Sequence, residues 1–272
     1  MIPALRHPFR VLARSLTFVG VTGIGVIEHA WRFRRVGLGD DPKVCAAWVQ
    51  RWSRRSLTRV GIRAEHVGRV PTRGMVVCNH LGYLDIGVIA ISGPMLFVSK
   101  AEVARWPFMG SLARCAGSLF LRRDRRSHVA EIASAFRPII EGGTVVAIFP
   151  EGTSSGGDSV LPFRPSLLEP AAANGWPVTP ACLTYEVAEG TVAEDLAYWR
   201  DMTFAPHFLN LMAQRWIVGR VEYGDPISGL SDRKELARRL HAEVSGMLER
   251  RHREKRQGVA SAGITGANLT NL

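Results

Sequence analysis

Residues 75–85 read Met-Val-Val-Cys-Asn-His-Leu-Gly-Tyr-Leu-Asp, and this stretch carries the pattern that decides the fold. Met75–Cys78 is a short apolar run, which predicts a buried β-strand. Asn79 and His80 follow that strand, and Asp85 falls at the start of the next helical stretch. Ligands bind beyond the carboxyl ends of strands in open α/β sheets, so His80 and Asp85 are predicted at a binding edge.

The same alternation of short apolar runs and amphipathic stretches continues along the chain. Further strands are predicted at Met95–Ser99, Ser118–Leu121, Val145–Phe149, Val178–Tyr185 and Trp216–Val221. Helices are predicted at Glu102–Cys115, Asp124–Glu141, Ser166–Asn174 and Asp232–Arg253. Alternating strands and helices predict an α/β fold, with a mostly parallel central sheet flanked by helices and preceded by an N-terminal membrane-associated helical segment.

The composition bounds what this chain can be. With 272 residues, of which 46% are hydrophobic, it is long enough to bury a sizeable core. The four cysteines are far apart and form no C-x-x-C pair, so we expect no metal site and a reducing compartment.

The positive charge is concentrated at the N-terminus. The chain carries a net charge of +11, and most of it falls in residues 1–63, which hold twelve Lys or Arg and three Asp or Glu. A basic end on a nearly neutral body predicts attraction to an anionic surface. The apolar content of the same segment favours a lipid surface, so an anionic membrane is the expected partner and nucleic acid is not.

An uncharged stretch, Ser15–Ile27, lies between arginines in this N-terminal segment. Its thirteen residues are fewer than the roughly 20 that a spanning helix needs. No small-x-small cleavage site follows it, so we expect an uncleaved anchor that enters the interface. A tilted crossing is the alternative.

A second N-terminal helix is predicted to start at Asp41-Pro42. Trp48 and Trp52 recur on it at helical spacing beside basic residues, which suits a helix in the headgroup region. Taken alone, the Trp stripe fits packing on the protein core equally well, but the neighbouring Ser15–Ile27 run favours the membrane. The predicted organisation is therefore anchoring helices over 1–63, a body over 64–257 and a disordered tail over 258–272.

Two further clusters follow predicted strands. Pro150-Glu151-Gly152-Thr153 places a carboxylate and a turn after Val145–Phe149, where backbone N–H groups can hold an oxyanion. The segment 122–126 delivers several guanidinium groups after Ser118–Leu121, which suits phosphate contacts.

Together these clusters resemble the four ordered motifs of the glycerolipid acyltransferases, and most of all the bacterial 1-acylglycerol-3-phosphate acyltransferases. The motifs read Asn79-His80-x4-Asp85, Gly117-x-x-Phe120-x-x-Arg123, Phe149-Pro150-Glu151-Gly152-Thr153 and Val178-Thr179-Pro180. The resemblance covers about residues 75–185, and the first and third motifs are its specific part.

The resemblance implies a role for each matching residue. His80 would be the general base and Asp85 its partner, while Glu151, Gly152 and Thr153 would bind the acceptor. Basic side chains would meet the phosphate of the acceptor, and the matching positions are Arg123 and Lys100. Acyl-CoA or acyl-carrier protein would donate the acyl group, with no cofactor and no metal.

The first expectation for function is acylation of 1-acyl-sn-glycerol-3-phosphate to phosphatidic acid in phospholipid biosynthesis, at the cytoplasmic face of the inner membrane. One departure affects it: Ser154 stands where the family often has Arg. Arg164 is a hypothetical substitute for that charge. The run from Ser154 to Asp158 also looks like relatives that acylate other lysolipids, including lyso-ornithine lipid.

A serine hydrolase is the more distant alternative. Residues 152–156 match G-x-S-x-G with Ser154 as nucleophile, and Asp201 and His207 follow in the order Ser, Asp, His. Against it, Pro150-Glu151 separates the strand from the turn, and Gly156, Gly157 and Pro162 oppose the helix that should follow the nucleophile.

Overall fold

The computed structural model describes residues 6–105, 109–121 and 128–267. Its centre is a seven-stranded sheet in the order β1-β7-β6-β2-β5-β3-β4. The strands are β1 (Ile62–Val67), β2 (Met75–Cys78), β3 (Met95–Lys100), β4 (Leu119–Leu121), β5 (Val145–Ile148), β6 (Val178–Val187) and β7 (Ile217–Tyr223). Neighbouring strands are parallel except for the antiparallel pair β6 and β7. The mostly parallel α/β sheet predicted from the sequence is confirmed.

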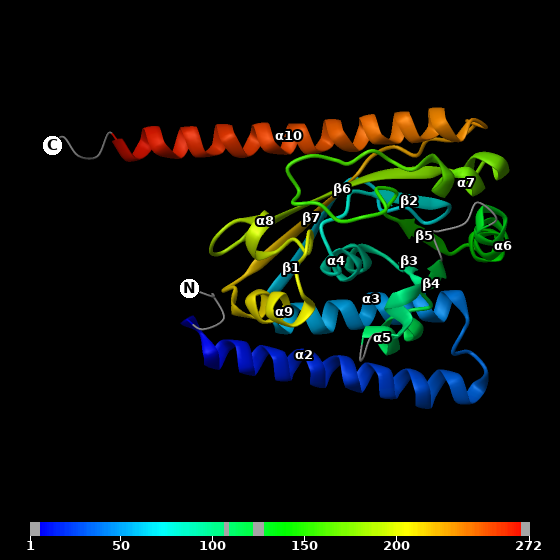
Figure 1. Cartoon of the computed structure of the whole chain (residues 1–272), viewed down its shortest axis with the longest axis horizontal. Coiled ribbons are helices and arrows are strands. Elements are labelled where there is room, and N and C mark those ends of the chain that lie inside the picture. The colour runs from blue at the N-terminus through cyan, green and yellow to red at the C-terminus, as the bar shows by residue number, and fades with distance from the viewer. Residues whose placement is uncertain (1–5, 106–108, 122–127, 268–272) are drawn as a thin grey trace.

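Helices cover both faces of this sheet (Figure 1). One face carries α3 (Pro42–Arg59), α4 (Leu84–Ser92), α5 (Met109–Cys115) and α9 (Phe204–Ala213), and the other carries α6 (His128–Glu141), α7 (Glu169–Asn174) and α10 (Arg233–Ala267). Successive residues of β2 alternate between the two cores, with Val76 and Cys78 in one and Met75 and Val77 in the other. A short helix, α8 (Val192–Asp195), follows β6.

Strand register brings together the two turns that carry the predicted site residues, one after β2 and one after β5; we call them the two catalytic turns. Strands β2 and β5 are parallel neighbours, with Val77 paired to Ile148. Both strands therefore end at the same edge of the sheet, and three residues further along each chain lie His80 and Glu151.

Several elements differ from the sequence prediction. The region Glu102–Cys115 is not one helix: a 3₁₀ turn, Ala101–Arg105, is separated from α5 by an interval that contains Pro107 in the sequence, a residue without a backbone donor. Strand β1 was not predicted, because charged residues interrupt its apolar pattern at this exposed sheet edge. Helix α10 continues past residue 258, where a disordered tail was expected, since residues 250–257 contain no proline and are rich in helix formers.

The N-terminal helix α2 spans Pro8–Glu28 and continues through a π-turn, His29–Phe33. It packs against α3, with Trp48 Nε1 donating to the carbonyl of Gly25 at 3.1 Å. Trp52 donates to the carboxylate of Glu28 at 2.7 Å. Both indoles are buried, at 4% and 8% exposure, so the Trp stripe of α3 packs inside the protein and does not lie in a headgroup region.

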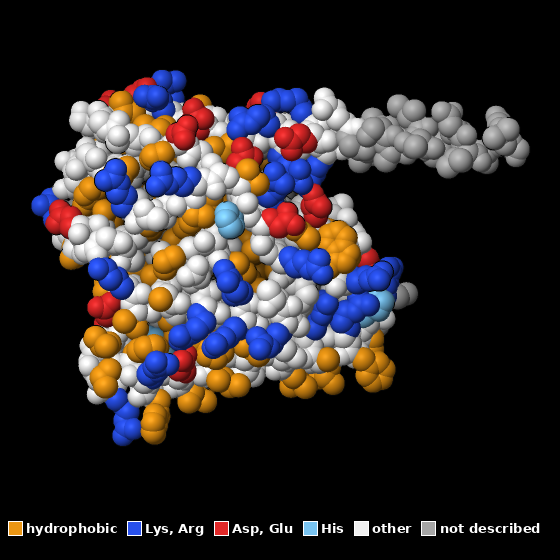
Figure 2. All heavy atoms as spheres, turned by 180° about the vertical axis from the view of Figure 1, so that it is seen from behind, with side chains coloured by type: hydrophobic (Ala, Val, Ile, Leu, Met, Phe, Trp, Pro, Cys, Tyr) orange, Lys and Arg blue, Asp and Glu red, His pale blue; other side chains and the backbone are white. Residues whose placement is uncertain are grey.

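The opposite side of α2 is apolar and exposed. Its exposed side chains recur at helical spacing and include Phe9, Leu12, Leu16, Val19, Ile24 and Ile27, and Trp31 of the π-turn is exposed as well. Figure 2 shows hydrophobic side chains projecting along the edge formed by α2, with Lys and Arg side chains in a band beside them. The helical stretch Pro8–Val36 is long and apolar enough to cross a membrane by length and composition alone.

Candidate active site

His80 and Asp85 form a hydrogen-bonded pair at the carboxyl end of β2. His80 Nδ1 lies 2.7 Å from Asp85 Oδ2. Since a carboxylate accepts the hydrogen bond, Nδ1 donates it, and in the neutral imidazole the other ring nitrogen, Nε2, keeps its lone pair. This is the tautomer that a general base requires.

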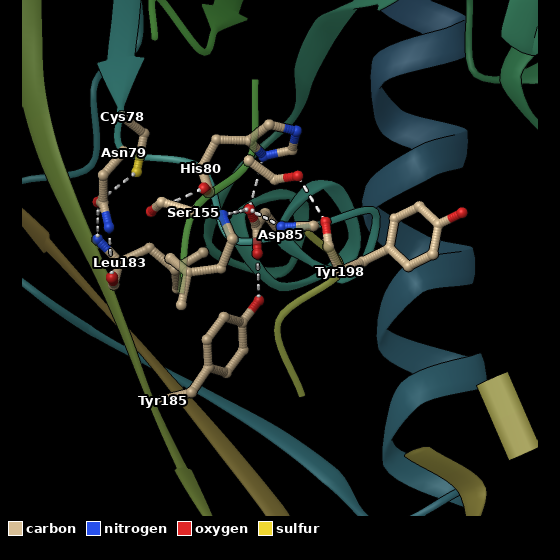
Figure 3. Close-up of polar contacts among 11 residues, drawn as sticks. Cys78, Asn79, His80, Asp85, Ser155, Leu183, Tyr185 and Tyr198 are labelled. Carbon is tan, nitrogen blue, oxygen red and sulfur yellow. Dashed lines mark hydrogen bonds and ion pairs between the residues drawn. The ribbon is translucent and has the colours of Figure 1, made fainter. Parts of the chain in front are cut away.

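Asp85 is fully buried, and all its contacts favour the charged carboxylate. Oδ2 also accepts from the backbone N–H groups of Leu81 at 2.7 Å and Gly82 at 2.9 Å. Oδ1 accepts from the phenol of Tyr185 at 2.9 Å. Figure 3 shows Asp85 between His80 on one side and Tyr185 on the other. These hydrogen bonds offset the cost of burying the charge and fix the carboxylate that orients His80.

Two neighbouring residues hold the His80 turn in place. The ring of Phe149, at the end of β5, stacks on the imidazole with centroids 4.1 Å apart. The Asn79 side chain donates to the carbonyl of Leu183 at 2.9 Å and accepts from its N–H at 2.7 Å, which ties the turn to β6. Both residues belong to the motifs quoted above, and the structure gives each a supporting contact.

The turn after β5 lies against the His80 turn. Ser155 N–H donates to the carbonyl of His80 at 2.8 Å. Gly152 has φ of +76°, and a Cβ there would lie 2.6 Å from Nε of Arg164. Glycine is therefore required both by the backbone conformation and by the guanidinium that lies over it. Thr153 is exposed beside this turn.

Glu151 is buried beneath the same turn, with 3% of its surface exposed. Oε1 accepts from Leu161 N–H at 3.3 Å, while Oε2 has no hydrogen-bond partner among the described residues. Burial raises the pKa of Glu151 from 4.5 to about 8, because desolvation outweighs the backbone N–H groups that favour the ionised form. Its role in acceptor binding stays a prediction.

The remaining predicted site residues divide into two groups. Arg164 is exposed and lies over Gly152, close to where a substitute charge was expected. Arg123 lies outside the described residues, as does the side chain of Lys100, so their predicted contacts with phosphate have no structural description.

The serine hydrolase arrangement is not assembled. Ser154 Oγ donates to the carbonyl of Tyr198. His207 is buried, with Nε2 3.0 Å from the carbonyl of Leu196 and Nδ1 2.9 Å from the phenol of Tyr83. Both ring nitrogens of His207 are thus used by groups other than Ser154, and Asp201 is exposed. These contacts tie His207 to the fold and leave it no role as the base of Ser154.

An apolar channel of about 320 Å³ reaches the His80 turn. His80, Gly152, Thr153 and Ser154 line it on one side. The apolar walls come mainly from α2, α3, α4, α5 and α9. From Trp48 to Leu57, both in the channel wall, α3 advances about 13 Å. The site therefore combines an oriented imidazole with an elongated apolar cavity.

Sequence reasoning missed the support that comes from distant segments. Tyr185 is separated from Asp85 by 100 positions, and Tyr198 contacts both catalytic turns from a loop beyond the fourth motif. No spacing rule links such residues, because the contacts depend on how strands and loops meet in space. The one available signal for Tyr185 was its position on β6, the strand that also carries the fourth motif.

Comparisons with known proteins agree with this geometry. Residues 61–184 match the family model described as Acyltransferase. A lyso-ornithine lipid O-acyltransferase of Rhodobacter capsulatus is 38% identical over 65% of this chain and 67% of its own length. Another of that name, from Pseudomonas aeruginosa, is 31% identical over 86% of this chain and 92% of its own length.

Relatives named for a different acceptor also match this chain. A 1-acyl-sn-glycerol-3-phosphate acyltransferase of Neisseria gonorrhoeae is 32% identical over 42% of this chain and 45% of its own length. The crystal structure of the 1-acyl-sn-glycerophosphate acyltransferase of Thermotoga maritima has the same fold, with a TM-score of 0.65 and 19% identity over 91% of this chain and 97% of that one. The ordered motifs, the His80–Asp85 pair and these relatives lead to one conclusion: the chain is an acyltransferase that acts on lysolipids and belongs to the glycerolipid acyltransferase family.

Proposed function

We propose that this protein transfers an acyl group from a thioester to the free hydroxyl of lyso-ornithine lipid at a membrane surface. The observation that carries the choice of acceptor is the extent of similarity to enzymes named for that lipid, which spans nearly the whole chain. The sequence motifs alone favoured 1-acyl-sn-glycerol-3-phosphate. The relatives named for that acceptor are less similar in sequence than the Rhodobacter capsulatus enzyme with its 38% identity, so it becomes the competing acceptor.

The reaction requires one base and no covalent enzyme intermediate. His80 Nε2 removes the proton of the acceptor hydroxyl while the hydroxyl oxygen attacks the thioester carbonyl. The tetrahedral intermediate collapses, the C–S bond breaks, and the imidazolium returns its proton to the departing thiolate. Asp85 stabilises the imidazolium in between, as its 2.7 Å contact with Nδ1 supports.

The negative oxygen of the intermediate needs hydrogen-bond donors. The backbone N–H groups of Thr153 and Ser154 form no hydrogen bond with any described residue, and both residues line the channel beside His80. We assign them as the oxyanion donors.

The headgroup of the acceptor would lie near Gly152. The guanidinium of Arg164 there can pair with a carboxylate as well as with a phosphate, because both are planar or forked arrays of oxygens. An ornithine headgroup carries a carboxylate, and Ser154 occupies the position where a phosphate-binding Arg was expected from the resemblance.

Membrane attachment through α2 fits this acceptor. The exposed apolar face of α2 and the basic residues around it suit an interface with anionic lipid, on the cytoplasmic side where acyl thioesters are available. The acyl chain would occupy the channel along α3, which reaches the imidazole.

A transfer assay tests the proposal directly. The full chain in anionic vesicles receives a labelled acyl group from acyl-CoA in one arm and from acyl-carrier protein in another, with lyso-ornithine lipid or lysophosphatidate as acceptor. We expect kcat/KM for lyso-ornithine lipid to exceed that for lysophosphatidate by about tenfold or more, a difference of about 1.4 kcal/mol. Equal or reversed values would assign the protein to the phosphate-bearing acceptor.

A further inference from the structure

A short segment, residues 196–199, connects the two catalytic turns; we call it the bridging segment. Tyr198 N–H donates to the carbonyl of Leu81, next to His80, at 2.7 Å. The carbonyl of Tyr198 accepts from Ser154 Oγ in the other turn. One residue of the bridging segment thus contacts both the turn that carries the base and the turn assigned to the oxyanion (Figure 3).

Two glycines allow the bridging segment to lie against both turns. A Cβ on Gly82 would lie 2.9 Å from Cβ of Tyr198 and 3.0 Å from its nitrogen. A Cβ on Gly156 would lie 2.8 Å from the ring of Trp199. A side chain at Gly82 would push the segment away from the turn, and one at Gly156 would displace the Trp199 ring.

His207 on α9 holds the bridging segment from the other side. Its Nε2 lies 3.0 Å from the carbonyl of Leu196 and 3.2 Å from that of Ala197, so it carries a proton and donates. Its Nδ1 then accepts from the phenol of Tyr83, at 2.9 Å, in the His80 turn. The imidazole is 6% exposed, and burial lowers its pKa, which keeps it neutral with one donor and one acceptor.

Helix α9 is itself fixed to the N-terminal helix. Phe208 packs on Phe18 of α2 with ring centroids 5.6 Å apart. Arg10 donates to the carbonyl of Ala213 at 2.9 Å, and Arg14 donates to that of Gln214. His207 therefore extends from a helix that is held at both ends of its contact with α2.

We propose that His207 is a positioning residue for acyl transfer. Through the bridging segment it sets the separation between the His80 imidazole and the backbone donors of residues 153–154, and through Tyr83 it fixes the turn that carries His80. The inference rests on the proposed transfer mechanism. A displacement of about 1 Å between such groups lowers a rate by roughly 10²-fold without weakening substrate binding equally, so the effect falls on kcat.

The test compares His207→Ala with His207→Gln, because a glutamine side chain offers one donor and one acceptor in place of the imidazole. We expect His207→Ala to lower kcat by about 10- to 100-fold with KM changed by less than about threefold. His207→Gln should recover most of kcat. A rise in KM with unchanged kcat, or equal losses in the two variants at equal folded fraction, would overturn the proposal.

A double variant tests whether the effect passes through the bridging segment. Ser154→Ala removes the side-chain hydrogen bond to the carbonyl of Tyr198. Combined with His207→Ala, it should lower kcat by clearly less than the product of the two single losses, since both changes loosen one segment. Losses that multiply would mean that the two residues act independently, which contradicts the proposal.

A measurement without substrate separates this inference from the proposed function. Hydrogen exchange at the amide of Tyr198, read by mass spectrometry on the full chain, reports whether the bridging segment stays bonded to Leu81. The exchange should accelerate in His207→Ala and return towards the parent rate in His207→Gln. An unchanged exchange rate in His207→Ala would contradict the positioning role of His207 even if acyl transfer were demonstrated. Normal exchange behaviour with no transfer by the parent protein would instead refute the proposed reaction alone. Should His207→Ala fail to fold, Tyr83→Phe removes the contact to Nδ1 alone and tests the link from His207 to the His80 turn by the same comparison of kcat with KM.

Discussion

The phenol of Tyr185 donates a hydrogen bond to Oδ1 of Asp85 at 2.9 Å, although the two residues are 100 positions apart. The other carboxylate oxygen of Asp85, Oδ2, accepts the hydrogen bond from Nδ1 of His80. Burial, and secondarily the charge of Asp85, raises the pKa of Tyr185 well above its usual range, so the phenol remains a donor at any working pH. The orientation of the general base thus depends on a strand far away in the sequence.

Tyr185→Phe should destabilise the protein by about 1–3 kcal/mol, because it leaves a buried carboxylate oxygen without its donor. Denaturant unfolding at constant m-value measures the loss. Tyr223→Phe is the matched control, since that buried phenol bonds the hydroxyl of Ser92 at 2.6 Å, and its loss should cost about 0.5–1.5 kcal/mol. Acyl transfer should fall only in the Tyr185 variant. Equal effects in both variants would show that the hydrogen bond to Asp85 contributes no more to stability and activity than the one to Ser92.

His80→Ala should abolish most acyl transfer with the fold intact. Loss of a general base lowers a rate by roughly 10²–10⁴-fold. Steady-state transfer measures this loss, and circular dichroism checks the fold. His66 on β1 is exposed and outside the channel lining, so His66→Ala is the control and should retain parent activity. Near-parent turnover by His80→Ala would rule out the mechanism.

Because burial raises the pKa of Glu151, we expect the free energy of unfolding to depend on pH in a specific way. Its pKa of about 8 in the folded state lies above the value of 4.5 expected in the unfolded chain. Between these values the folded state retains a proton that the unfolded state releases. Its contribution therefore falls as pH rises, by up to about 1.4 kcal/mol per pH unit.

Glu151→Gln removes this titration, and it isolates the effect from other groups. The difference in unfolding free energy between parent and variant should shift in favour of the variant as pH rises from 5 to 8, and it should level off above the folded pKa. Urea unfolding at a series of pH values provides the measurement. A difference that does not vary with pH would show that Glu151 ionises in the folded protein as it does in water.

Gly152→Ala tests the contact between the third-motif turn and Arg164. The positive φ of +76° costs about 1–2 kcal/mol for any side chain, and the new Cβ displaces the guanidinium. Gly143 has φ of +83° with no atom near a new Cβ, so Gly143→Ala carries the same strain without the clash. We expect similar stability losses but a fall in transfer, mainly through KM for the acceptor, only in the Gly152 variant. Equal activity of the two variants would contradict a role for Arg164 at the acceptor site.

Local sequence predicted the features that depend on neighbouring residues. The apolar runs before His80 and Glu151 gave strands β2 and β5, because short buried strands have a composition that short-range patterns detect. The Asp41-Pro42 start of α3 was also evident, and Asp41 Oδ1 accepts from the N–H groups of Lys43 and Val44. Edge strand β1 escaped prediction, since an exposed edge imposes little apolar periodicity.

The sequence by itself determined the α/β class, the two catalytic turns and the family, because each is encoded in a contiguous stretch. Only the tertiary structure decided that Trp48 and Trp52 are buried, that His207 bonds Tyr83 and not Ser154, and that residues 196–199 join the two turns. The physical reason is that a local pattern specifies which residues are apolar or helical. Partners across many positions are specified by strand register and helix packing, which form only when the whole chain folds.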